Sequence, residues 1–112
     1  MYYTNQHLVN ARKILTKIRD KGLEFDIECD GDDLVELHTS IDSAIKHGID
    51  QVEECVIYVW SVKEDQDGKK NVVGTIGHII WNNCNDADEC IADYTMSLDD
   101  YLGEGWDRLQ KD

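Results

Sequence analysis

Between Leu23 and Asp30 apolar and acidic residues alternate without interruption, and this run constrains the fold more than any other segment. Successive side chains of an extended chain point to opposite sides, so a period of two predicts a half-buried β-strand. Its apolar residues would face the core. The acids, continuing into the next turn, would share the other face at intervals of about 6.6 Å. They are Glu24, Asp26, Glu28, Asp30 and Asp32.

Helical spacing marks the segments on either side of this strand. Apolar residues recur every three or four positions, as in a helix with one buried stripe. The first helix would start from a cap at Thr4 or Asn5 and stop at Gly22, and the second would extend from a cap at residues 32–33 to Gly48. The predicted stripes are Leu8, Ala11, Ile14 or Leu15, and Ile18 in the first helix, and Leu34, Leu37, Ile41, Ala44 and Ile45 in the second.

Residues 55–62 and 72–81 are rich in β-branched and aromatic side chains, which favour strands. The polar segment between them includes an Asp-Gly pair at Asp67, so the two runs predict a β-hairpin with a loop longer than two residues. Gly74 and Gly77 lie within the second run, where glycine indicates a bulge or a close approach of backbone.

Residues 90–95 predict a further antiparallel strand, and Ser97 is placed to cap a final helix that ends at Gly103. The expected order is helix, strand, helix, hairpin, strand, helix. Strands grouped in this way indicate a single α+β domain over residues 1–112, with an antiparallel sheet of three to four strands and helices packed on one face.

The chain has 24 acids and 11 bases, for a formal net charge of −13. Nucleic acid and anionic membranes are themselves negative, so direct binding to either is not expected, and a basic partner protein is favoured. Five bases lie in the first 22 residues, whereas residues 23–45 and 71–107 contain no Lys or Arg. The basic first helix could dock on an acidic face of a second copy, which would give a homodimer.

Neither a secretory signal nor a transmembrane run of about 18 apolar residues is recognisable, so a cytoplasmic protein is expected. Cys29, Cys55, Cys84 and Cys90 lack the spacing of a zinc site and are interpreted as reduced, mostly buried thiols. No catalytic motif links the four scattered histidines to a nucleophile or a metal, so we do not expect an enzyme.

One segment partly matches a calcium-binding loop. Asp26, Glu28, Asp30 and Gly31 fit the first, third, fifth and sixth positions of an EF-hand. The twelfth position, which requires a bidentate Glu, is occupied by Leu37. We therefore expect no metal and no other cofactor.

The row of carboxylates on the predicted strand suggests a more specific role. Each strand of duplex DNA carries one phosphate charge per roughly 3.4 Å, and regularly spaced carboxylates can replace phosphates before a protein that binds nucleic acid. The alternative is a solvated face that only serves solubility. The candidate partner-binding residues include the acids of the next helix and of the loop after the hairpin. They are Glu24, Asp26, Glu28, Asp30, Asp32, Asp33, Glu36, Asp42, Asp86, Asp88 and Glu89.

Two short patterns also occur in known proteins. They consist of Asp32, Asp33, Leu34, His38, Asp42, Ala44, Ile45 and His47, and of Trp81-Asn82-Asn83 with Ile91-Ala92-Asp93-Tyr94-Thr95, Leu98 and Leu102. The first resembles a helix in the Ocr family of antirestriction proteins, and the second is similar to small phage accessory proteins. The resemblance implies a DNA mimic, commonly dimeric, that occupies the DNA groove of a restriction or other defence complex. The hairpin, the basic first helix and the lower charge density depart from the Ocr fold.

These features together predict an inhibitor encoded by a phage or mobile element. It would act as an acidic DNA mimic in a basic groove of a restriction or CRISPR system of the host. The alternative is a protein-interaction module that does not mimic DNA. In that case aromatic residues of the hairpin would contact the partner, and the acids would confer solubility.

Overall fold

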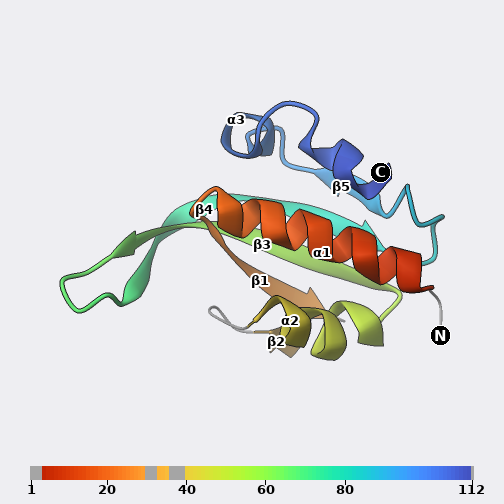
Figure 1. Ribbon diagram of the computed structural model, residues 1–112, viewed down its shortest axis with the longest axis horizontal. Coiled ribbons are helices and arrows are strands. Elements are labelled where there is room, and N and C mark those ends of the chain that lie inside the picture. The colour runs from red at the N-terminus through yellow and green to blue at the C-terminus, as the bar shows by residue number, and fades with distance from the viewer. Residues whose placement is uncertain (1–3, 30–32, 36–39, 112) are drawn as a thin grey trace.

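The computed structural model describes residues 4–29, 33–35 and 40–111 (Figure 1). The protein is an α+β structure with five strands in one antiparallel sheet, in the order β2-β1-β3-β4-β5. Among the described helices, none combines the length and the apolar character that a membrane crossing requires. With η for a 3-10 helix, the elements are α1 (Asn5–Asp20), β1 (Glu24–Cys29), β2 (Asp33–Val35), α2 (Ile41–His47), η1 (Ile49–Gln51), β3 (Glu54–Glu64), β4 (Lys70–Asn82), β5 (Ile91–Tyr94), α3 (Leu98–Leu102) and η2 (Trp106–Lys111).

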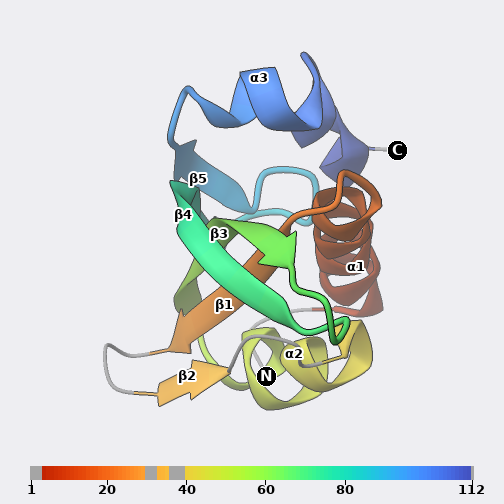
Figure 2. The ribbon, with the colours of Figure 1, turned by 90° about the vertical axis from the view of Figure 1, so that its left-hand side faces the viewer.

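Helix α1 covers one side of the sheet, with α2 below it on the same side, while no described helix covers the opposite side (Figure 2). Thr4 is the N-cap, and its main-chain N–H donates to Nδ1 of His7 at 3.1 Å. Gly22 follows the helix with a φ of +76°, a conformation that suits glycine. The predicted apolar stripe is confirmed, because Ala11, Ile14, Leu15 and Ile18 are fully buried.

Strand β1 confirms the period of two. Phe25 and Ile27 are buried in the core, while Asp26 and Glu28 are half-buried on the other face. The predicted second helix is wrong at its start. Asp33–Val35 pairs antiparallel with β1, and the resulting strand β2 raises the number of strands above the three or four expected. This also means that the segment resembling an Ocr helix is not one continuous helix.

Helix α2 begins only at Ile41, because Ser40 is its N-cap. The Oγ of Ser40 accepts the main-chain N–H of Ser43 at 3.1 Å, and Ala44 and Ile45 then enter the core. Of the predicted stripe, Leu34 belongs to β2 and Ile41, Ala44 and Ile45 belong to α2, while Leu37 lies outside the described residues. Apolar residues at this spacing fit a short strand as well as a helix, so the pattern alone did not distinguish the two.

The predicted hairpin is confirmed, and its far end projects from the body of the protein (Figure 1). Register shifts follow Val59 and Ser61, so the ladder is irregular next to both glycines of β4. At the tip, Oδ1 of Asp65 accepts the main-chain N–H groups of Lys69 and Asp67, each at 2.9 Å. The bond from Lys69 contributes most to lowering the pKa of the Asp65 carboxyl below its ordinary value.

The chain after β5 closes the core. Trp106 is 2% exposed and packs edge-on against Tyr94, with the ring centroids 5.0 Å apart. Ser97 precedes α3 as predicted, but its hydroxyl does not cap the helix. It donates instead to the carbonyl oxygen of Ile76 at 2.8 Å, which ties α3 to β4. Gly103 ends α3 with a φ of +91°.

We predict that Gly77→Ala lowers the free energy of unfolding by about 1–3 kcal/mol, because the new methyl group meets a neighbouring segment. An added Cβ would lie 2.7 Å from Cβ of Thr95. The matched control is Gly74→Ala on the same strand, where no atom lies within 4 Å of the added Cβ. That substitution should change stability by less than about 0.5 kcal/mol. Urea unfolding of both variants measures the difference, and equal stabilities would contradict the close approach.

Candidate partner-binding site

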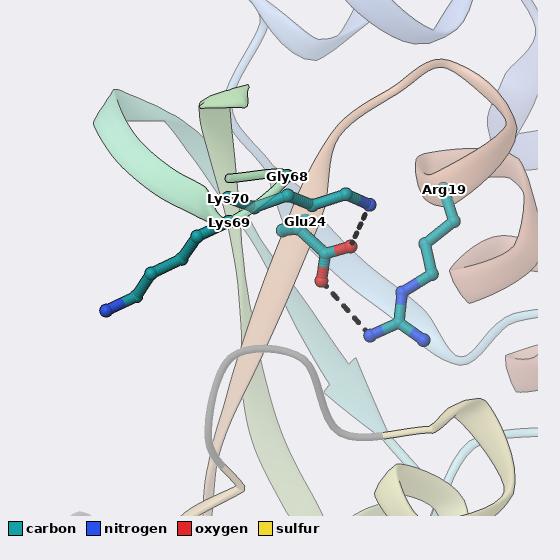
Figure 3. A pocket seen from close by; sticks show the side chains of 5 residues that line it. All are labelled: Arg19, Glu24, Gly68, Lys69 and Lys70. Atoms are coloured by element: carbon teal, nitrogen blue, oxygen red, sulfur yellow. Dashed lines mark hydrogen bonds and ion pairs between the residues drawn. The ribbon is translucent and has the colours of Figure 1, made fainter. Parts of the chain in front are cut away.

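Glu24, the first acid of the predicted row, is drawn into the protein. Its side chain is only 3% exposed, and its two carboxylate oxygens lie 3.1 Å from Nη2 of Arg19 and 3.5 Å from Nζ of Lys70 (Figure 3). The guanidinium of Arg19 also stands over the ring of Phe25, 4.5 Å from its centroid. The charge of Glu24 is therefore neutralised within the chain, which corrects the expectation that it binds a partner.

The residues around Glu24 line a shallow pocket where three elements meet. Arg19 comes from α1, Glu24 from β1, and Gly68, Lys69 and Lys70 from the tip of the hairpin and the start of β4 (Figure 3). Arg19 and Lys70 both contact the single buried carboxylate of Glu24, so this corner joins the hairpin to the body of the protein. Lys70 is remote from Glu24 in sequence, and for this reason the spacing of the acids did not reveal the pair.

Asp42 also departs from the expectation, because it forms an ion pair with Arg12 of α1. The two side chains are 78% and 49% exposed. Water screens a pair of this kind, so the contact contributes little to stability, yet it offsets the charge of Asp42.

Asp26 and Glu28 are half-buried on the side of the sheet away from the helices, as the alternation predicts. Glu28 accepts a hydrogen bond from the hydroxyl of Tyr58 at 2.9 Å. This bond is the main cause that raises the pKa of Tyr58 above its ordinary value, followed by desolvation. With Glu24 neutralised and Glu28 hydrogen-bonded, the described part of the row is not a continuous ridge of available carboxylates. Asp30, Asp32 and Glu36 lie outside the described residues, and the side chain of Asp33 is not described.

Asp86, Asp88 and Glu89 are all exposed on the loop between β4 and β5. None of these three carboxylates forms an ion pair with a described residue. The loop also closes on itself, because the main-chain N–H of Glu89 donates to the carbonyl of Asp86 at 2.8 Å. These acids therefore present uncompensated charge, as the sequence predicts.

Buried hydrogen bonds hold this loop to the body of the protein. Asn83 is fully buried; its Oδ1 accepts from Nε1 of Trp81 at 2.7 Å, and its Nδ2 donates to the carbonyls of Ile49 and Val52 at 2.8 and 2.9 Å. Two side chains of α1 reach further along the loop. They are His7, whose Nε2 lies 2.8 Å from the carbonyl of Asn85, and Asn10, whose Nδ2 donates to the carbonyl of Ala87 at 2.8 Å.

Glu53 and Glu54 lie beside this loop. They are not among the candidate partner-binding residues predicted from the sequence. The carbonyl of Glu53 accepts the main-chain N–H of Asn83 at 2.7 Å, and Glu54 is paired with Asn82 in the ladder. Both glutamates are exposed. The position of Glu54 at the start of one hairpin strand, opposite the end of the other, was the signal that could have revealed them. We call these five exposed acids the acidic end: Glu53, Glu54, Asp86, Asp88 and Glu89.

The opposite end of the molecule is richer in bases. Helix α1 starts beside the acidic end and finishes toward the projecting hairpin (Figure 1). Its last turn carries Lys17 and Arg19, and Lys21 follows the helix. The hairpin adds Lys63, Lys69 and Lys70 near the same end. The charge of the chain is thus distributed unevenly along its length.

Among the described residues, no group of three or more His, Cys, Asp or Glu side chains is placed to hold a metal ion. Cys29, Cys55 and Cys90 are buried, and Cys84 is exposed. Burial raises the pKa of the Cys90 thiol to about 11 and that of Cys55 further, which keeps both in the neutral form.

Comparisons with known protein families, with curated proteins and with solved structures find no match for this chain. The function is therefore inferred from the positions and the chemistry of the residues themselves.

We predict that Glu24→Ala lowers the free energy of unfolding by about 2–4 kcal/mol, because it leaves Arg19 and Lys70 without their buried anion. The matched control, Asp42→Ala, removes an exposed ion pair and should cost less than about 1 kcal/mol. Chemical unfolding measures both values. If the two variants lose the same stability, Glu24 does not join the hairpin to the body of the protein.

We predict that the phenol of Tyr58 ionises at higher pH than an ordinary tyrosine, since its proton is held by Glu28. A raised pKa in the folded state means that this bond adds stability below the ordinary tyrosine pKa of about 10 and loses it as the pH rises through the folded value. Ring signals in NMR spectra report the titration. Glu28→Gln should lower the pKa of Tyr58, whereas Asp100→Asn on α3 should leave it unchanged.

Proposed function

We propose that this chain is an anti-defence protein of a phage or mobile element. It binds a basic, nucleic-acid-binding protein of a host restriction or CRISPR system and occupies the groove meant for DNA, in the cytoplasm of the host cell. The acidic end is the observation that supports this function. Two segments that are distant in the sequence bring their carboxylates to one end of the protein, and these carboxylates lack cationic partners among the described residues.

The way the loop is held also supports mimicry. Phosphates on duplex DNA have fixed positions, so a mimic gains affinity when its carboxylates are ordered before binding. Asn83, His7 and Asn10 supply this order through hydrogen bonds from the core and from α1. A flexible acidic tail would lose more conformational entropy on binding the same groove.

The predicted strand row now has a smaller part in this function. Glu24 of this row is offset by Arg19 and Lys70, and Asp42 of α2 is offset by Arg12. Glu28 remains next to the acidic end, because it is paired with Val56 in the ladder, two residues from Glu54. The bases at the opposite end would be repelled by a cationic partner, so the field of the protein favours approach with the acidic end first.

A second candidate function is a protein-interaction module that does not mimic DNA. The uncovered side of the sheet favours it, because Tyr58 and Trp60 are half-buried there. By contrast, Trp81 and Trp106 are buried in the core and cannot contact a partner. In this function, aromatic contacts would carry the affinity.

We predict that replacing all five carboxylates of the acidic end by amides weakens binding to the host target by at least about tenfold, since charge-assisted contacts are lost. The protein is immobilised, its target is captured from bacterial lysate and identified by mass spectrometry, and the affinity is measured at rising NaCl. Duplex DNA should displace the chain from the target, and the affinity of the unmodified chain should fall steeply with salt.

The control removes the same number of exposed acids elsewhere, so that the net charge of both variants is equal. Its affinity should fall by less than about threefold if position matters and not only the total charge. The mimicry proposal is wrong if the two variants lose the same affinity, or if salt and duplex DNA have no effect. The five control positions are Asp20, Glu64, Asp67, Asp100 and Glu104.

A further inference from the structure

A shallow groove follows helix α1 where the C-terminal segment packs beside it. The segment η2 lies along one flank of α1, and α2 lies along the opposite flank (Figure 1). Two adjoining hollows of about 450 and 210 Å³ form the groove, and Lys17 of α1 and Leu109 of η2 line both of them. We call this feature the helix groove: Thr16, Lys17, Lys21, Leu102, Trp106 and Leu109.

The helix groove offers two cations on the side of α1. Lys17 and Lys21 are one helical turn apart, and neither forms an ion pair within the part of the chain that the structure describes. Asp20 and Glu104 also border the groove, but neither is paired with these lysines. Both ammonium groups can therefore receive carboxylates from another molecule.

The acidic end lies on the same flank of α1, nearer the start of the helix. Asn10 donates through Nδ2 to the carbonyl of Ala87 at 2.8 Å, which holds the loop with Asp86 and Asp88 against the helix. Asn10 and Lys17 are seven residues apart, so their side chains point to the same side of α1. The helical rise separates them by about 10 Å along the axis. One flank thus carries acids near its start and cations near its end.

Because this flank is complementary to itself, we infer that the helix groove binds the acidic end of a second copy of this chain. A two-fold axis perpendicular to α1, level with the middle of the helix, makes the two helices antiparallel. It brings Asp86 and Asp88 of each copy to Lys17 and Lys21 of the other. The contact is closed, since the same two surfaces meet in both directions, and the product is a dimer.

The net charge of the chain does not prevent this contact. In about 0.15 M salt, charges separated by more than about 8 Å are largely screened, while carboxylates and ammonium groups in contact still attract each other. The half-buried side chain of Leu109 adds apolar surface to the groove. A small, polar interface of this kind gives a weak and reversible dimer, with a Kd of about 10–100 μM.

Sedimentation velocity of the intact, purified chain tests the inference, in about 0.15 M NaCl and at about 1 μM to 1 mM protein. Lys17→Glu with Lys21→Glu should weaken the dimer at least about tenfold, because like charges then face each other. The matched control is Lys63→Glu with Lys69→Glu, which makes the same change in net charge at exposed positions of the hairpin. It should weaken the dimer by less than about threefold.

Reversing the other side of the contact gives a rescue experiment. Asp86→Lys with Asp88→Lys should weaken the dimer as much as the change at Lys17 and Lys21. When the two charge-reversed variants are mixed, every acid again meets a base, so a heterodimer should form with about the affinity of the unmodified chain. If either variant fails to fold, Lys17→Gln with Lys21→Gln, which only removes charge, should weaken the dimer at least about threefold.

Several outcomes would overturn the inference. One is a chain that stays monomeric up to about 1 mM, and another is a dimer that the change at Lys17 and Lys21 leaves intact. Species larger than a dimer would contradict the two-fold contact. A monomeric chain that needs these lysines to bind an acidic protein of the lysate would make that protein the occupant, in place of a second copy.

This inference does not rest on mimicry, and the two can fail separately. Lys17→Gln with Lys21→Gln leaves the acidic end unaltered, so it should lose the dimer and keep the host target. If the chain binds no basic host protein while the dimer responds as expected, only mimicry is wrong. If the variant with five amides at the acidic end still forms the dimer, the second copy does not bind through these acids and the inference is wrong.

Discussion

Burial on one side of the sheet is the constraint on which the rest of this structure depends. The apolar stripe of α1 packs against the apolar face of β1, β3 and β4, and among the described elements no second layer of helices covers the other face. The alternating residues of β1 therefore separate into a buried set and a set that faces outward. This separation places the acids of β1 and the aromatic rings of β3 on the same surface.

Tertiary contacts at the two ends of the protein then determine which carboxylates are offset by a base and which stay exposed. Near the hairpin, Arg19 and Lys70 draw Glu24 out of the solvent and offset it. At the other end, the side chains of His7, Asn10 and Asn83 hold the loop that bears Asp86 and Glu89, and the carboxylates of this loop stay exposed. An acid that lies beside a base serves the fold, while an acid that lies beside neutral polar groups is available to a partner.

The local elements were largely predictable, because each depends on neighbours in the sequence. The period of two in β1, the helical stripe of α1 and the two β-rich runs of the hairpin all follow from side-chain direction along a regular backbone. The segment before α2 was not predictable in this way. Asp33–Val35 forms a strand because the edge of β1 offers unpaired backbone groups, and Ser40 provides a later start for the helix.

By itself, the sequence determined the α+β class, the half-buried character of β1 and the large excess of negative charge, since all three depend on composition and local periodicity. Only the tertiary structure decided which carboxylates stay available. Pairing Glu24 with Lys70, and bringing Glu53 beside the loop after β4, requires distant segments to meet. These contacts depend on the packing of α1 and on the register of the hairpin, and the periodicity of the sequence does not predict them.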